Sequence, residues 1–218
     1  EAVHAEFTAR TALQILERYG MTEAGMITSN PYDGQRVPGT VGFALPDVEL
    51  RVSDDAGIPV PTGVTGVVEI RSPGLFAGYW RMPDKTDSEH RAGGWFITGD
   101  VGSVDAEGRL SLEGRSSDMI ISGGYNVYPK EVEMVLDDVP GVLETGVIGV
   151  PHPDFGEAVV AVVVRDDSVD VSDATLAASL DGVLARFKHP KTYIAADELP
   201  RNAMSKVQKA ALRRVHAD

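Results

Sequence analysis

The chain has 218 residues, no cysteine, 43% hydrophobic residues and a formal net charge of −13. The length fits one or two domains with ordinary cores. The lack of cysteine excludes a disulfide framework and a thiolate site, and it fits a reducing cytoplasm. The negative charge argues against nucleic-acid or anionic-membrane binding, and the longest apolar run, residues 158–164, is too short to span a bilayer.

The first half of the chain is predicted to be mainly β. A helix is expected over residues 2–10, followed by a short strand over 14–18 that runs into a turn at Tyr19 and Gly20. Short alternating runs broken by Gly, Pro and Asp then predict an antiparallel, barrel-like region. Its strands are expected at residues 48–52, 66–71, 96–98, 102–104 and 110–113.

The pattern changes after Asp118, where helices and apolar strands alternate. Pro129 fits the first turn of a helix that runs through Asp137. Ser172 caps a second helix, and a third is expected over 207–215. The apolar face of the second helix comprises Leu176, Leu180, Leu184 and Phe187. Strands are expected at residues 119–122, 145–150, 158–165 and 193–196. The prediction is a small α+β domain after the β-rich region.

Four segments stand out, three that combine glycine with polar side chains and a fourth that is a tight turn ending in a lysine. They are Tyr19-Gly20-Met21-Thr22-Glu23, Ile97-Thr98-Gly99-Asp100, Gly114-Arg115 followed by Asp118 and Ser122-Gly123-Gly124, and the turn from Pro200 to Lys206. Lys206 can carry a flexible ammonium group away from its own domain, or it can be a solvated lysine at a helix start.

The C-terminal part of this acidic chain is basic. Residues 186–214 hold eight of the twenty Lys and Arg residues, opposed by two acidic ones. The basic residues are Arg186, Lys188, Lys191, Arg201, Lys206, Lys209, Arg213 and Arg214. They predict either a solubilising helix face or a local site for a polyphosphate.

The order and spacing of these segments resemble those of the acyl-adenylate-forming enzymes, which include acyl-CoA synthetases, peptide-synthetase adenylation domains and luciferases. The resemblance covers essentially the whole chain. It implies an α+β fold in which residues 1–116 are the end of a large adenylation domain and residues 117–218 are a mobile C-terminal lid domain, with a hinge at Ser117. It also implies that the chain lacks the family's phosphate loop, so that alone it is an incomplete, poorly active fragment.

The resemblance implies roles for several residues of the first domain. Tyr19 would stack on the adenine of ATP, the Thr22 hydroxyl would bond the α-phosphate, and Glu23 would ligate Mg²⁺, which prefers carboxylate oxygen. Asp100 would accept hydrogen bonds from the ribose hydroxyls, and Arg115 would also contact the ribose. Turns and surface side chains without a ligand are the alternatives.

In the second domain, Lys206 would be the adenylation lysine, bridging the substrate carboxylate and the α-phosphate. Its position on an accessible loop would also suit a protein lysine acetyltransferase, which would remove the charge. The thiol arm of coenzyme A would run past Gly123. Phe187, His189 and Lys191 would hold the nucleotide end of coenzyme A, with a flexible turn and a basic helix terminus as the alternatives.

Residues 19–38 resemble malonyl-CoA synthetases most closely, and Met26 would form a wall of the acyl pocket. The implied enzyme is an AMP-forming acid–thiol ligase. It would join a small carboxylate, malonate or methylmalonate, to coenzyme A through an acyl-adenylate, releasing AMP and pyrophosphate. The alternatives are a ligase for medium-chain, long-chain or aryl acids, and a non-catalytic fragment that binds coenzyme A or another protein.

Overall fold

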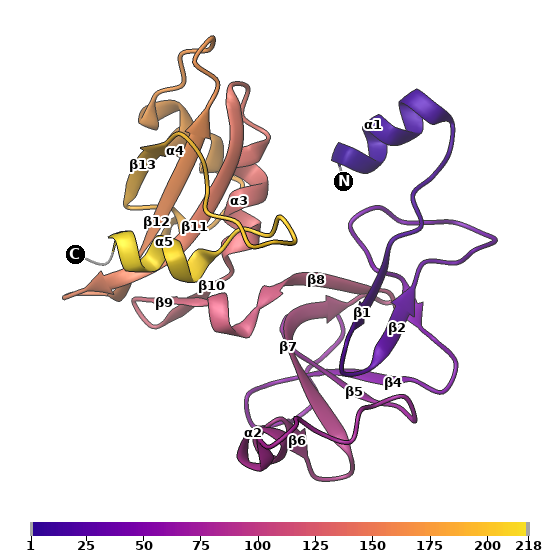
Figure 1. The fold of residues 1–218 in the computed structure, drawn as a ribbon. Coiled ribbons are helices and arrows are strands. Elements are labelled where there is room, and N and C mark those ends of the chain that lie inside the picture. Colours follow the sequence, from indigo (N-terminus) through magenta and orange to yellow (C-terminus); the bar gives the residue numbers. More distant parts are fainter. Residues whose placement is uncertain (1, 217–218) are drawn as a thin grey trace. The chain divides into compact units, whose positions relative to one another are not determined.

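The structure is a computed structural model that describes residues 2–216, and the chain divides between Ser116 and Ser117 into two compact units. Unit 1 contains α1, α2 and β1–β8, and unit 2 contains β9–β13 and α3–α5 (Figure 1). Each unit mixes helices with sheets, which confirms the α+β class. Within residues 2–216, no helix has both the length and the apolar character needed to cross a membrane.

Unit 1 is built on two antiparallel sheets. The first joins β1 (Arg18–Met21), β2 (Gly25–Ser29) and β3 (Phe43–Ala44) in that order. The second has the order β4-β5-β7-β6, with β8 also paired to β7. Its strands are β4 (Glu49–Ser53), β5 (Gly66–Arg71), β6 (His90–Arg91), β7 (Trp95–Val104) and β8 (Leu110–Arg115). Helix α1 (Ala2–Thr11) precedes β1, and α2 (Pro83–Ser88) precedes β6. The antiparallel strands are confirmed, but over the described residues the sheets do not close into a barrel.

Three predicted strands of unit 1 differ from those in the structure. The strand expected at 14–18 forms instead at Arg18–Met21, where Tyr19 pairs with Thr28 and the following turn is at 22–24. The two strands expected at 96–98 and 102–104 are one continuous strand, β7. Gly99 has φ 73°, a conformation that glycine adopts without strain, so the backbone continues through this point. Asp100 therefore lies inside a strand, opposite Arg115, and not at a strand end.

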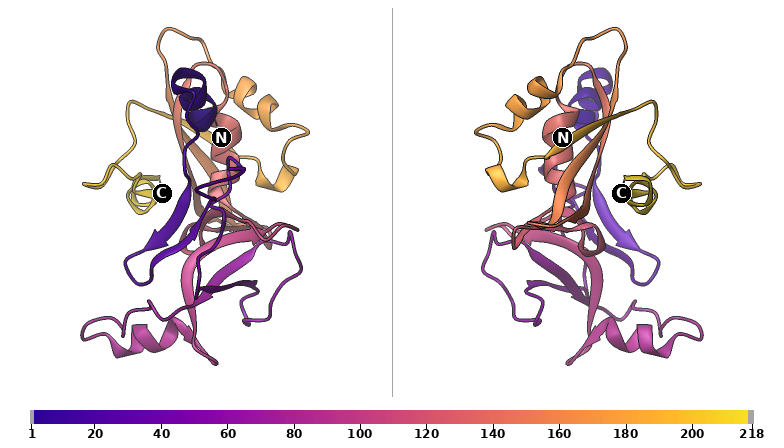
Figure 2. Two further views of the ribbon diagram at one scale, coloured as in Figure 1. Left: turned by 90° about the vertical axis from the view of Figure 1, so that its right-hand side faces the viewer. Right: turned by 90° about the vertical axis from the view of Figure 1, so that its left-hand side faces the viewer.

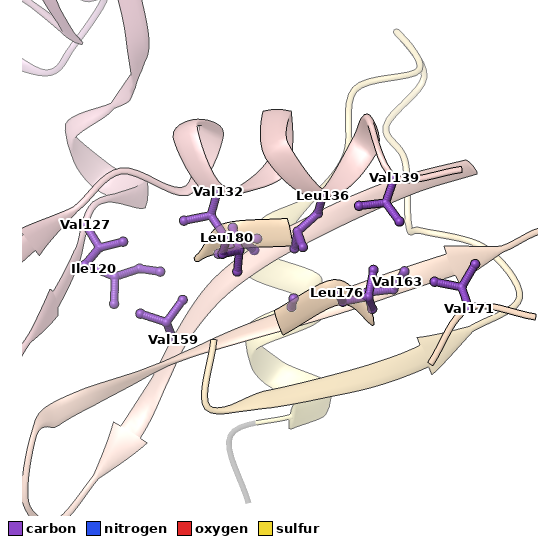
Figure 3. Close-up of a cluster of buried hydrophobic side chains, with 12 residues drawn as sticks. Ile120, Val127, Val132, Leu136, Val139, Val159, Val163, Val171, Leu176 and Leu180 are labelled. Atoms are coloured by element: carbon purple, nitrogen blue, oxygen red, sulfur yellow. The ribbon is translucent and has the colours of Figure 1, made fainter. Parts of the chain in front are cut away.

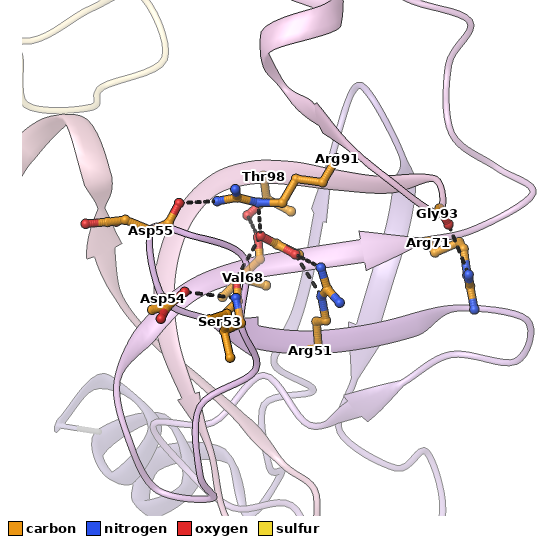
Figure 4. Close-up of polar contacts among 11 residues, drawn as sticks. Arg51, Ser53, Asp54, Asp55, Val68, Arg71, Arg91, Gly93 and Thr98 are labelled. Atoms are coloured by element: carbon orange, nitrogen blue, oxygen red, sulfur yellow. Dashed lines mark hydrogen bonds and ion pairs between the residues drawn. The ribbon is translucent and has the colours of Figure 1, made fainter.

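The core of unit 1 lies around β5 and β7. Val68, Ile70 and Phe96 are fully buried there. Glu69 is fully buried as well, although the alternation of a strand places it on the opposite face from Val68 and Ile70. Both faces of β5 are therefore covered, one by apolar side chains and the other by the polar cluster of Figure 4.

Unit 2 contains one five-stranded sheet with helices on both faces. The sheet has the order β10-β9-β12-β11, and β13 pairs with β12 in parallel. Its strands are β9 (Ile120–Ser122), β10 (Tyr125–Val127), β11 (Val142–His152), β12 (Gly156–Arg165) and β13 (Thr192–Ala196). The helices are α3 (Pro129–Asp137), α4 (Asp173–Leu180) and α5 (Lys209–His216), with short 3-10 turns at Ser116–Asp118 and Arg186–Lys188. Figure 2 shows α5 on the opposite side of the sheet from α3 and α4.

The alternation of side chains along β12 accounts for this arrangement. Val159 and Val163 join the cluster that α3 and α4 cover (Figure 3), whereas Val160 and Val162 join the cluster that includes Leu212 of α5. A strand buried on both faces reads as a continuous apolar run, as residues 158–164 do.

Helix α4 is shorter than its apolar pattern suggests. Ser172 caps it as predicted, accepting a hydrogen bond from the Thr175 N–H at 3.1 Å. The helix ends at Leu180, before Gly182, which has φ 77°. Leu184 and Phe187 lie beyond the helix, yet they still pack against the same core cluster. Their burial thus comes from the turns that follow α4 and not from a continued helix.

Candidate active site

Three residues that the sequence places in the nucleotide site meet at one carboxylate in unit 1. The Tyr19 hydroxyl donates a hydrogen bond to Oδ2 of Asp100, and Nε of Arg115 lies 2.7 Å from Oδ1 of the same residue. Asp100 and Tyr19 are 6% and 8% exposed, whereas half of the Arg115 side chain is exposed. The cross-strand pairing of β7 with β8 brings Arg115 opposite Asp100. The cluster therefore has a buried carboxylate and phenol, together with one guanidinium that is half exposed.

The surroundings of Tyr19 keep its hydroxyl protonated. Burial raises the pKa of the phenol, and the hydrogen bond to Asp100 raises it further. Thr98 fixes the backbone beside the carboxylate, because its Oγ1 donates to the Val68 carbonyl at 2.8 Å and accepts from the Asp100 N–H at 3.1 Å. Asp100 is therefore held by a neutral donor, a guanidinium and a rigid strand. Such a carboxylate is preorganised to accept hydroxyl donors.

Thr22 and Glu23 lie in the turn between β1 and β2, with the Thr22 side chain exposed. The Glu23 carbonyl accepts a hydrogen bond from the Phe76 N–H at 2.8 Å. Its carboxylate is 3.1 Å from the Tyr79 hydroxyl, which is also 2.6 Å from Oε2 of Glu89. Burial and these two carboxylates raise the pKa of Tyr79, so the hydroxyl remains a donor.

The turn offers hard oxygen donors for a cation. Within residues 2–216, no three His, Cys, Asp or Glu side chains gather into a group that could hold a metal ion. Mg²⁺ is usually bound by one or two carboxylates, with substrate phosphates and water completing its shell. The single carboxylate of Glu23 fits that mode, whereas a cage made by protein groups alone is not present in this range. Met26, the predicted wall residue, is 42% exposed on the neighbouring strand β2.

Lys206 lies in an exposed turn of unit 2 that Asn202 organises. Oδ1 of Asn202 accepts hydrogen bonds from the N–H groups of Met204 and Lys206, each at 3.0 Å. The Asn202 N–H donates to the Lys206 carbonyl at 2.9 Å. Arg201 donates to the Ser205 carbonyl at 2.7 Å and also pairs with Glu144 of β11. The backbone of Lys206 is therefore fixed, while its side chain is exposed to solvent.

Local ion pairs neutralise most of the basic stretch. Five of its eight cationic side chains have an acidic partner within unit 2, and these are Arg186, Lys188, Arg201, Lys209 and Arg213. Lys191, Lys206 and Arg214 make no ion pair among the described residues. Lys206 and Lys209 differ in this respect although they are only three residues apart, because Lys209 lies 2.7 Å from the nearly buried Glu133. Lys191, Lys206 and Arg214 are therefore the cations of this stretch that could bind an anion without breaking a local ion pair.

Ser205 adopts a left-handed conformation with φ 60°, which costs a residue with a Cβ about 1–2 kcal/mol. Glycine avoids this cost but loses more entropy on folding. We therefore expect Ser205→Gly to raise the free energy of unfolding by about 0.5–1 kcal/mol, measured by urea denaturation. Ser205→Ala, which keeps the Cβ, is the control and should give no gain. A stabilisation by alanine equal to that by glycine would show that the backbone conformation is not the cause.

The residues predicted to contact coenzyme A gather around the β9–β10 hairpin of unit 2. Gly123 has φ 60°, and its N–H donates to the Phe155 carbonyl at 2.8 Å. The Phe187 ring stacks on Tyr125 of β10, with centroids 4.7 Å apart, and Lys191 Nζ lies 5.3 Å from the Phe155 ring centroid. Nε2 of His189 is 3.0 Å from the Leu184 carbonyl, which leaves Nδ1 as its second polar atom. Aromatic faces, an available ammonium and a glycine backbone thus occur together.

Several residues around the site were not found from the sequence. Tyr79 contacts Glu23 across 56 residues of chain and also contacts Glu89, and no local spacing pattern connects the three residues. Glu144 anchors the turn of Lys206 from another strand. Asn202 is different, because an Asn that accepts from nearby N–H groups is a recognisable turn signal.

Each unit of the chain contains a segment that matches a known family model. Residues 1–80 match the family model described as AMP-binding enzyme, and residues 131–206 match the AMP-binding enzyme C-terminal domain. The chain belongs to the family of AMP-binding enzymes. The matches cover both units, and the resemblance inferred from the four sequence segments is confirmed.

Among curated relatives, the long-chain-fatty-acid–CoA ligase of Yersinia pestis is 37% identical over 98% of this chain and 38% of its own length. The mitochondrial malonate–CoA ligase ACSF3 of Mus musculus is 37% identical over 95% of this chain and 39% of its own. The crystal structure of ATP-bound MatB from Rhodopseudomonas palustris is 54% identical, with a TM-score of 0.95 over the whole chain and 43% of MatB. The chain thus spans about two fifths of the length of these relatives.

Proposed function

We propose that the protein is an ATP-dependent acid–thiol ligase that forms acyl-CoA through an acyl-adenylate. In the first half-reaction, a carboxylate oxygen attacks the α-phosphorus of ATP and pyrophosphate leaves. In the second, the thiol of coenzyme A attacks the acyl carbon and AMP leaves. The observation that carries the proposal is the meeting of Tyr19 and Arg115 at the carboxylate of Asp100. The family and the ATP bound by MatB support the same conclusion.

Unit 1 would supply the nucleotide contacts. Asp100 and Arg115 would hold the ribose, and Tyr19 would orient Asp100 and face the adenine. Thr22 would bond the α-phosphate, and Glu23 would hold Mg²⁺. When bound, this ion would offset the negative charge of the phosphates. Lys206 of unit 2 would place its ammonium between the attacking carboxylate and the α-phosphate, where charge develops in the transition state.

Unit 2 would also bind coenzyme A. Gly123 lets an extended thiol arm pass close to the backbone of the hairpin. Phe187 offers an aromatic contact, and Lys191 and His189 offer donors to the phosphate groups of the nucleotide end. Because Lys188 is paired with Glu131 at 2.5 Å, Lys191 is the stronger phosphate ligand of this segment.

For the acyl group, we propose a small dicarboxylate, malonate or methylmalonate. The malonate–CoA ligase of mouse and the resemblance of residues 19–38 support this choice, and Met26 would line the acyl pocket. A long-chain acid is the second candidate, because the ligase of Yersinia pestis matches the chain at the same identity. Trapping the acyl-adenylate with hydroxylamine separates the two. With the protein in its natural length, malonate or methylmalonate should give more hydroxamate than acetate, a medium-chain acid or a long-chain acid, and the reverse order would refute the dicarboxylate assignment.

Residues 1–116 would then be the end of the adenylation domain, and residues 117–218 the mobile C-terminal domain. Contacts on both sides of Ser117 support a hinge there. Ser116 Oγ donates to the Gly99 carbonyl of unit 1 at 3.1 Å, and Asp118 Oδ1 accepts from Arg213 of unit 2 at 3.2 Å. Ser117, which is exposed, lies between these two anchored residues.

A hinge at Ser117 predicts unequal effects on the two half-reactions. Lys206 and Gly123 serve different steps from one unit, so the unit must turn between the steps. We expect Ser117→Pro, which fixes φ, to slow thioester formation more than adenylation, whereas Ser117→Ala should change neither. Stopped-flow assays of the separate steps measure this. An equal slowing of both steps by proline would contradict the hinge.

A further inference from the structure

The Tyr79 hydroxyl joins two carboxylates that come from different segments of unit 1. It lies 2.6 Å from Oε2 of Glu89 and 3.1 Å from Oε1 of Glu23. A phenol has a single proton and can donate to one carboxylate at a time. The two hydrogen bonds are therefore alternatives, and both acceptors lie within donating distance of the hydroxyl. Tyr79 can hold Glu23 through Oε1 while the other oxygen of that carboxylate stays available to a cation.

The tyrosine itself is held firmly. Its ring packs edge-on against Phe76 with centroids 4.8 Å apart, and the Lys85 ammonium lies 4.0 Å from the ring centroid. Its backbone N–H donates to Thr86 Oγ1 at 2.9 Å. Because Phe76 also donates to the Glu23 carbonyl at 2.8 Å, the segment 76–79 contacts both the backbone and the side chain of Glu23. The position of this carboxylate thus depends on a segment more than fifty residues away.

The charges around the hydroxyl favour a cation. Glu23 and Glu89 carry like charges on either side of one oxygen, and like charges this close repel. Lys85 offsets part of the charge on Glu89, from 3.7 Å. A divalent cation at Glu23 would lower the remaining repulsion. A cation bound at Glu23 would therefore stabilise this pair of carboxylates.

We propose that Tyr79 and Glu89 are positioning residues that set the affinity of Glu23 for Mg²⁺. The inference rests on the proposed function, because it takes Glu23 as the ligand of a Mg²⁺ ion bound with ATP. Tyr79 fixes the carboxylate, and Glu89 orients the hydroxyl and adds negative charge near the ion. Neither contacts substrate. Outer-shell partners of metal ligands act in this way, and their removal typically costs about 10–100-fold in metal affinity or activity.

The test measures how ATP binding depends on Mg²⁺, by equilibrium dialysis of labelled ATP with the protein in its natural length. Tyr79→Phe removes the hydroxyl and keeps the ring. We expect it to raise the half-saturating Mg²⁺ concentration about tenfold, the lower end of the outer-shell range, with kcat at saturating Mg²⁺ nearly unchanged. Glu89→Gln should shift it in the same direction by less. Tyr193→Phe is the matched control, because the Tyr193 hydroxyl has no hydrogen-bond partner among the described residues.

An unchanged Mg²⁺ dependence in Tyr79→Phe would overturn the inference, and so would a fall in kcat that saturating Mg²⁺ does not restore. If Tyr79→Phe fails to fold, Glu89→Gln decides alone, and the absence of a shift there overturns the inference. The wild-type protein tests the proposed function separately. Binding of ATP with Mg²⁺ but no acyl-adenylate from any carboxylate would refute the ligase. The half-saturating Mg²⁺ concentrations of the variants and the wild type would still test the roles of Tyr79 and Glu89.

Discussion

Replacing Lys206 by alanine should slow acyl-adenylate formation by about 10²–10³-fold, the usual cost of losing one preorganised electrostatic contact in a transition state. The structure supports an effect on chemistry rather than on stability. The side chain is exposed and makes no ion pair among the described residues, while hydrogen bonds between Asn202 and the Lys206 backbone hold the turn. Alanine preserves these backbone bonds. Thioester formation from supplied malonyl-adenylate should change much less.

Lys209 provides the matched control three residues away. Its ammonium is paired with the nearly buried Glu133, so Lys209→Ala should destabilise unit 2 without changing the ratio of the two half-reaction rates. Lys206→Gln, which also removes the charge, should behave like Lys206→Ala, and acetylation of the lysine should do the same. Separate single-turnover assays of each step measure these effects. Adenylation by Lys206→Ala within about threefold of wild type, far below the cost expected for such a contact, would show that Lys206 is only a solvated lysine.

Replacing Glu69 by alanine should lower the free energy of unfolding by about 3–5 kcal/mol, the range for breaking a buried ion pair. Glu69 is fully buried on β5 and accepts hydrogen bonds from Ser53 at 2.7 Å, Arg51 at 2.8 Å and Arg91 at 2.5 Å (Figure 4). Its removal leaves two largely buried guanidinium groups without a counter-charge. The loss should also disturb β7, which pairs with β5 and carries Asp100.

The same network predicts the pH dependence of stability. Burial raises the pKa of Glu69, but the hydrogen bonds from Ser53, Arg51 and Arg91 outweigh it and hold the pKa below its ordinary value. A carboxyl whose pKa is lower when folded stabilises the protein above its unfolded pKa, and the contribution is lost as the pH falls through the folded pKa. Urea denaturation of wild type and Glu69→Gln between pH 7 and pH 3 measures this. The wild type should lose more stability than the variant as the solution is acidified.

Glu49 is the control for Glu69. It pairs with Arg71 on the same sheet, but both side chains are about half exposed. Exposed ion pairs contribute little to stability, so Glu49→Ala should cost much less than Glu69→Ala. Equal losses in the two variants would contradict the assignment of Glu69 as a buried structural charge.

Local patterns predicted the elements whose signals lie within one segment. Strand β5 and helix α3 have the predicted bounds, because alternation and an initial proline define them. The bounds of β1, β7 and α4 differed, because strand partners and positive φ angles at Gly99 and Gly182 decided them. These are properties of tertiary pairing and of backbone geometry, which residue periodicity does not record.

The residues of the candidate site also divide into those found from sequence segments and those found only in the folded structure. The resemblance supplied Tyr19, Asp100 and Arg115, and the fold brings them together. Their roles toward ATP, like those of Lys206 and Gly123, stay predictions. Neither the Glu69 cluster nor the contacts of Tyr79 were predicted, since a polar side chain whose partners are distant along the chain looks like an ordinary exposed residue in the local pattern. Such clusters depend on pairings across 10–56 residues of chain.

The nucleotide product is the most direct test of the proposed ligase. The protein in its natural length would be incubated with ATP, Mg²⁺, coenzyme A and malonate, and the products separated by ion-exchange chromatography. Acyl-adenylate chemistry predicts one AMP and one pyrophosphate for each malonyl-CoA formed, with no AMP when malonate is omitted. Malonate-dependent release of ADP and phosphate would contradict the proposed ligase, because it requires attack at the γ-phosphorus. Lys206 is proposed to act at the α-phosphate, and the Asp100 cluster at the ribose.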